Sequence, residues 1–135
     1  MAVVTFTYQE FLDTLKANNL LPEQIVRAEV KNDCFHFAVR TDTFILPYVP
    51  ASLRYVDYEN NIARFDLVVV SPHFNKALGW FGHHLQSKLP DYVTLDLPYV
   101  LFDLEKIFEE KKIKGVSIKE IIHEPYQFTF VLETK

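Results

Sequence analysis

Residues 126–132 read Tyr-Gln-Phe-Thr-Phe-Val-Leu, and they alternate large apolar side chains with polar ones more regularly than any other stretch of the chain. Alternation with a period of two is typical of a strand that buries one face. Residues 116–122 precede this stretch, and His123-Glu124-Pro125 separates the two segments. The sequence therefore predicts a C-terminal β-hairpin whose second strand carries Phe128 and Phe130 on its apolar face.

Two further hairpins are predicted upstream from the same two-residue period. They cover residues 25–40, with a turn at Asn32-Asp33, and residues 44–71, with a turn at Glu59-Asn60-Asn61. Pro47 and Pro50 each lack the amide hydrogen that a strand donates, so the arm over 44–58 is expected to be an edge strand or to be bulged there. Val68 and Val70 make the end of the arm over 62–71 apolar on both faces, which favours a central strand.

The N-terminal helix is predicted over residues 8–18. Thr7 and Glu10 have the spacing of a capping box, in which each side chain accepts a hydrogen bond from the other residue's backbone amide. Phe6 and Phe11 occupy the two positions of a hydrophobic staple. Asn18-Asn19 offers a left-handed stop at the other end.

Two more helices are expected in the second half of the chain. The first covers residues 73–88 and contains Gly79 and Gly82, which each cost a helix interior about 1 kcal/mol relative to alanine. After a short strand at 92–95, the second begins at Asp96 or, because residues 99–102 also suit a strand, near Asp103. Gly115 ends it.

The predicted order is helix, four strands, two helices and two strands. Strands joined by short turns pair antiparallel, so we expect an α+β fold with a curved antiparallel sheet of about six strands and the helices packed on one face. A chain of 135 residues without a Gly/Ser linker or repeat is expected to form a single domain over residues 1–135.

Composition narrows the range of functions. The net charge is −4, and no run of basic residues exceeds Lys111-Lys112, so nucleic-acid binding is not expected. The single cysteine, Cys34, the absence of a signal-peptide pattern and the lack of a transmembrane segment favour a cytoplasmic protein. Twelve Phe and seven Tyr residues exceed ordinary usage and could fill a core, line a pocket or form an interface.

Chemical motifs are scarce. Three glycines rule out a phosphate-binding loop of the common kinds. His83 and His84 are adjacent and would point about 100° apart on a helix, while His73 and His84 share a face but lie roughly 16 Å apart. Cys34 and His36 lie two residues apart on a predicted strand, so their side chains share a face. We expect a structural role for both, in preference to a thiol activated by the imidazole. The sequence therefore predicts no metal, no cofactor and no catalytic residue.

Trp80, the only tryptophan, lies between the two helical glycines and could enter a partner's pocket. The same helix offers only Lys76 and Lys88 on its polar face, so contact with a membrane surface is a weaker expectation. The favoured function is a non-enzymatic binding protein that uses aromatic faces as an apolar-ligand pocket or for self-association in a homo-oligomer. The predicted ligand or interface residues are Trp80, Phe81, His84, Phe128 and Phe130.

Two alternatives remain open. One is an enzyme whose acid/base or metal site is assembled from dispersed residues, and its candidate groups are His36, His73, His84, His123 and Asp103. The other is an accessory subunit of a larger assembly. In that reading, strand 126–132 is the docking edge if it lies outermost in its sheet.

Overall fold

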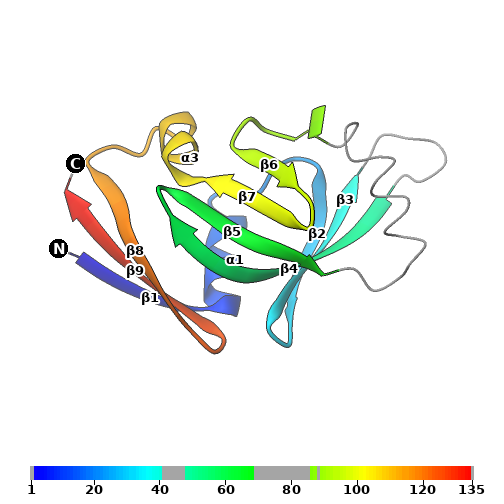
Figure 1. The fold of residues 1–135 in the computed structure, drawn as a ribbon, viewed down its shortest axis with the longest axis horizontal. Coiled ribbons are helices and arrows are strands. Elements are labelled where there is room, and N and C mark those ends of the chain that lie inside the picture. The colour runs from blue at the N-terminus through cyan, green and yellow to red at the C-terminus, as the bar shows by residue number, and fades with distance from the viewer. Residues whose placement is uncertain (1, 41–47, 69–85, 88, 135) are drawn as a thin grey trace.

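The structure is a computed structural model that describes residues 2–40, 48–68, 86–87 and 89–134. In these residues it has two antiparallel sheets and two helices (Figure 1). The smaller sheet has three strands in the order β1-β9-β8. Their bounds are β1 Ala2–Thr7, β8 Val116–Glu124 and β9 Gln127–Thr134. Both chain ends lie on this sheet, at one end of the molecule (Figure 1).

The larger sheet has six strands in the order β2-β3-β4-β5-β7-β6. Their bounds are β2 Ile25–Lys31, β3 Cys34–Arg40, β4 Tyr48–Glu59, β5 Ile62–Val68, β6 Val93–Asp96 and β7 Tyr99–Asp103. Asn60 and Asn61 join β4 to β5 with positive φ angles of 52° and 66°, as a two-residue hairpin turn of matching twist requires. Asn32, between β2 and β3, has a φ of 57°.

The predicted α+β class and the three predicted hairpins are confirmed. The sequence analysis did not predict β1, and the structure places this strand in a second, separate sheet. It pairs with β9 over its whole length, from Ala2 opposite Leu132 to Thr7 opposite Gln127. The C-terminal hairpin therefore completes a sheet of its own instead of extending the larger one.

Two predictions concern strand edges. The strand over residues 126–132 would be a docking edge only if it lay outermost, and it does not, since β9 lies between β1 and β8 and is paired on both sides. The prediction for the arm that contains Pro50 is an edge strand or a bulge, and the edge is corrected because β4 lies between β3 and β5. Pro50 lies opposite Ala38 of β3, and on the side of β5 the residues that follow Val68 lie outside the described part of the chain. Pro47 lies outside the described residues.

The expected helix after residue 96 begins at the later of its two predicted starts. Tyr99–Asp103 forms β7, and α3 covers Leu104–Glu110. Asp103 caps this helix by accepting a hydrogen bond from the Lys106 amide at 3.1 Å. Residues 99–103 form a strand and not the start of the helix, because β7 is paired with β5 on one side and with β6 on the other. The helix predicted over 73–88 lies outside the described residues except for 86–87.

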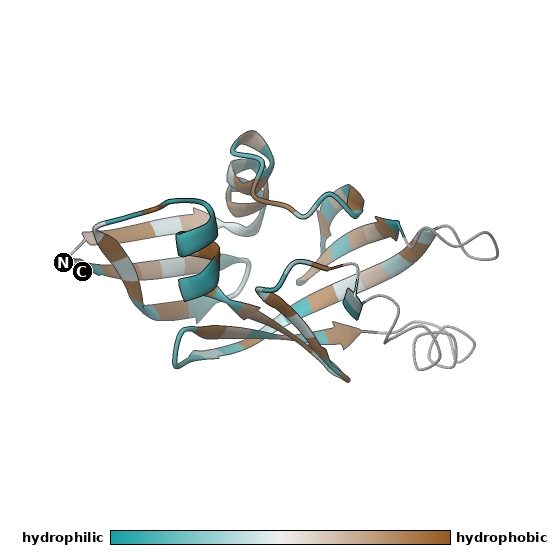
Figure 2. Ribbon diagram, turned by 90° about the horizontal axis from the view of Figure 1, so that it is seen from above, coloured by the Kyte–Doolittle hydropathy of each residue, from teal (hydrophilic) through white to brown (hydrophobic). Residues whose placement is uncertain are grey.

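Helix α1, Tyr8–Ala17, follows β1 directly and confirms the predicted capping box. The Glu10 amide donates to the Thr7 hydroxyl at 3.1 Å, and the Thr7 amide donates to the Glu10 carboxylate at 2.9 Å. The rings of Phe6 and Phe11 are 6.4 Å apart, as in a hydrophobic staple. Asn19, with a φ of 54°, follows the C-terminal end. In Figure 2, α1 has hydrophilic residues on its outer side.

The buried face of α1 helps to join the two sheets. Tyr8 and Leu12 pack in one buried cluster with Phe35 and Tyr55 of the larger sheet and Phe128 of the smaller one. A hydrogen bond reinforces this junction: the Tyr58 hydroxyl of β4 donates to the Ile118 carbonyl of β8 at 2.8 Å. That carbonyl adjoins a register shift between Ile118 and Glu120, and such bulges commonly interrupt the regular ladder of bonds.

Removal of the N-terminal cap tests this account of α1. We expect Thr7→Ala to lower the free energy of unfolding by about 1 kcal/mol, because the Glu10 amide loses its hydrogen-bond acceptor. Urea unfolding followed by circular dichroism measures the change. Thr134→Ala, at the exposed end of β9, is the matched control and should change stability by less than about 0.5 kcal/mol. Equal losses in the two variants would contradict the capping role.

Candidate functional site: an apolar cavity with a polar mouth

An apolar cavity of about 430 Å³ lies among residues from both sheets and both helices. Phe11 and Leu15 line it from α1, Phe128 and Phe130 from β9, and Ile107 and Phe108 from α3. The larger sheet contributes Phe35, Leu53, Ala63 and Phe65 among others. Helices at two sides of a pair of curved sheets thus bring apolar side chains toward one space.

Aromatic rings form much of the wall. The Phe128 ring lies 4.9 Å from that of Tyr8, 5.1 Å from that of Tyr55 and 5.3 Å from that of Phe11, measured between centroids. Several of these pairs are edge-to-face, which is a favoured aromatic geometry. Phe128 is 2 % exposed. A wall of interlocked, buried rings has little freedom to collapse into the cavity.

The described residues of the cavity wall include no charged side chain. Thr14, Tyr55 and Tyr92 are the ones that carry a polar side-chain atom. The Thr14 hydroxyl is already used, because it donates to the Glu10 carbonyl at 2.8 Å. Burial raises the pKa of Tyr55 to about 12, with the charge of Asp57 as a further cause. The interior therefore suits a ligand part that needs no hydrogen bonds.

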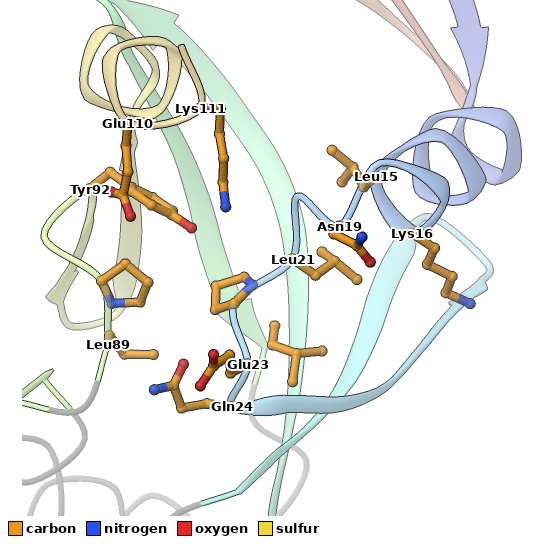
Figure 3. A pocket seen from close by; sticks show the side chains of 13 residues that line it. Leu15, Lys16, Asn19, Leu21, Glu23, Gln24, Leu89, Tyr92, Glu110 and Lys111 are labelled. Carbon is orange, nitrogen blue, oxygen red and sulfur yellow. The ribbon is translucent and has the colours of Figure 1, made fainter. Parts of the chain in front are cut away.

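A second pocket, of about 780 Å³, adjoins the cavity (Figure 3). The two share five lining residues: Leu15, Leu21, Pro22, Ile25 and Tyr92. The second pocket also has polar and charged side chains, which are Lys16, Asn19, Glu23, Gln24, Glu110 and Lys111. They come from the end of α1, the segment before β2 and the end of α3 (Figure 3). Because it shares these five residues with the apolar cavity, we call this pocket the polar mouth.

A polar pair lies on the far side of the aromatic wall. The Tyr8 hydroxyl is hydrogen-bonded to Nε2 of His123, and the two rings are stacked with centroids 6.0 Å apart. Burial raises the pKa of Tyr8 to about 12, with the charge of Asp33 adding to the effect. Desolvation lowers the pKa of His123, so its imidazole is held neutral at neutral pH. The neutral ring can accept the tyrosine's hydrogen bond.

The candidate acid/base groups that are described lie apart in the fold and have separate partners. His36, on β3, hydrogen-bonds through Nδ1 to the Ser52 hydroxyl at 2.6 Å, whereas His123 lies on β8 in the other sheet. Asp103 caps α3. Burial raises the pKa of the Cys34 thiol, whose sulfur also donates to Asp33. Within the described part of the chain, no three His, Cys, Asp or Glu side chains are grouped to hold a metal ion.

The sequence-derived site residues divide into two groups. Phe128 and Phe130 line the apolar cavity. Trp80, Phe81 and His84 lie outside the described residues, as does His73. Sequence reasoning did not identify Tyr92 or the contributions of α1 and α3. Tyr92 precedes a four-residue strand and has no local pattern that marks it as a site residue.

Comparison with protein-family models, curated proteins and solved structures finds no match to this chain. Neither of the two described helices has the length and apolar character needed to cross a bilayer. The site must therefore be interpreted from its own geometry and chemistry.

The buried tyrosines at the cavity wall predict alkaline sensitivity. A tyrosine ionises near pH 10 when unfolded, whereas Tyr55 in the folded protein ionises near pH 12. The folded state thus retains a proton that the unfolded state has lost, and its stability falls as pH rises from about 10 to about 12. Urea unfolding at a series of pH values measures this fall. Tyr55→Phe should reduce the slope, and Tyr48→Phe, at a residue 55 % exposed, should leave it unchanged.

Proposed function

We propose that the protein is a non-enzymatic binding protein that holds an apolar small molecule, such as a hydrocarbon chain, in the cavity between its two sheets. The observation that carries this proposal is a cavity of about 430 Å³ whose described wall has no charged side chain. Small-molecule sites in proteins are concave, mostly apolar and about 300–1,000 Å³ in volume. The size and chemistry of this cavity both fall within that description.

Energetics favour an apolar ligand in this space. The described wall offers few hydrogen-bonding partners to water that enters from the mouth, so this water is easily displaced. A hydrocarbon ligand gains about 0.8 kcal/mol for each methylene that it buries.

The volume also indicates the size of the ligand. Each water molecule occupies ~30 Å³ in the liquid, so about 430 Å³ accommodates roughly fourteen groups of that size. A chain of about a dozen carbons fits this space. Self-association through Trp80 remains a separate prediction, because that residue lies outside the described part of the chain.

Binding of a fluorescent apolar probe tests the proposal. N-phenylnaphthylamine should bind saturably at one site per chain and gain fluorescence on leaving water, and native mass spectrometry should show the same stoichiometry. At a free concentration one hundred times its Kd, the ligand should raise stability by about 2.7 kcal/mol. Absence of both saturable probe binding and a co-purified ligand would overturn the proposed function.

A cavity-filling substitution locates the probe. Ala63, 4 % exposed on β5, lines the cavity, so Ala63→Leu should place added atoms in empty space and lower probe affinity at least tenfold. It should not impose the loss of about 1–3 kcal/mol that overpacking of a filled core produces. Ala51→Leu is the control, since Ala51 of β4 is not one of the residues that line the cavity. Equal loss of probe affinity in both variants would place the probe elsewhere.

A further inference from the structure

We propose that the ligand carries an uncharged hydrogen-bonding head, an alcohol or an amide, which lies in the polar mouth against the hydroxyl of Tyr92. The site would therefore select a fatty alcohol or fatty amide over the fatty acid of the same length. This inference rests on the proposed function, because it assumes that the apolar part of the same molecule fills the cavity.

Tyr92 is placed at the boundary between the two spaces. Its side chain is 4 % exposed, and it lines both the apolar cavity and the mouth. Figure 3 shows its hydroxyl directed into the mouth, on the side where Lys111 also points inward. Among the described residues, no side chain or backbone group is hydrogen-bonded to this hydroxyl, which is not one of the fully buried polar atoms and is therefore open to the mouth. A ligand head at the mouth would provide a hydrogen-bond partner.

The charges around the mouth disfavour an anionic head. Lys16 and Lys111 are opposed there by Glu23 and Glu110, so the formal charges cancel. Lys16 is already engaged, since its ammonium group donates to the Ala28 carbonyl at 2.7 Å. Burial, and then the negative charge of Glu110, raises the pKa of Tyr92. The mouth thus presents both a carboxylate and an ammonium group near this hydroxyl, without an excess of positive charge (Figure 3).

These conditions distinguish between the possible heads. A carboxylate at this position would lose hydration and lie near Glu110 without a net positive charge to compensate, which is costly. An alcohol or amide loses less on desolvation and can both donate and accept hydrogen bonds. It can therefore bond to the Tyr92 hydroxyl and also use the mixed donors and acceptors of the rim.

Competition between two ligands of equal chain length tests the inference. Dodecanol and dodecanoate are each titrated at pH 8, where the acid is ionised, against the full chain loaded with N-phenylnaphthylamine. Dodecanol should displace the probe at a concentration at least tenfold lower than dodecanoate. Tyr92→Phe should weaken dodecanol about fivefold relative to the probe, the value of one hydrogen bond. Tyr48→Phe is the control variant.

A second variant changes the selectivity without removing the hydroxyl. Glu110→Gln takes one negative charge from the exposed rim and should strengthen dodecanoate binding more than dodecanol binding. Equal or tighter binding of dodecanoate to the unmodified protein, or an unchanged dodecanol affinity in Tyr92→Phe, would overturn the uncharged head while probe binding still supports the cavity. Failure of the probe and of both ligands to bind would instead overturn the proposed function itself.

Discussion

The ring of Phe128 packs between the two sheets, where it contacts Tyr8 of α1, Phe35 of β3 and Tyr55 of β4. These residues come from the beginning, the middle and the end of the chain, so their contacts hold the smaller sheet against the larger one. The pairing of β1 with β9 also helps to hold the two sheets together, because it brings α1, which follows β1, to this cluster. The cavity and its mouth depend on the relative placement of sheets and helices that the ring cluster fixes.

The cluster also explains why space remains beside it. Planar rings in edge-to-face contact pack well with one another but cannot deform to fill an irregular volume. Methionine fills such gaps best, because its side chain is unbranched and flexible, and Met1 is the only methionine in the chain. A wall of Phe, Tyr, Leu and Ile side chains between two sheets therefore preserves an open space, and the high aromatic content acquires a structural meaning that composition alone did not give it.

Local signals in the sequence were sufficient for most elements. The Thr7–Glu10 capping box, the turn at Asn60-Asn61 and the alternation through Phe128 and Phe130 each depend on residues close together in the chain, and each is present as predicted. The errors concern long-range pairing. Nothing within residues 2–7 shows that they meet residues 127–132, and this pairing places β9 in the centre of its sheet, so that it does not lie outermost as a docking edge would. The placement of β4 between β3 and β5 likewise depends on pairing between segments and not on Pro50 itself.

The candidate site was harder to predict than the fold for the same reason. Phe128 and Phe130 could be predicted because apolar and polar residues alternate along their strand. Such alternation cannot distinguish a filled core from the wall of a cavity. That distinction depends on the volume left between side chains from separate elements. Tyr92 illustrates the limit most clearly: its importance lies in a buried ring whose hydroxyl opens to a charged mouth formed by the ends of α1 and α3. Under the proposed function, an apolar interior joined to a polar rim would order a ligand along one direction, and the group at the boundary would then determine which head is accepted.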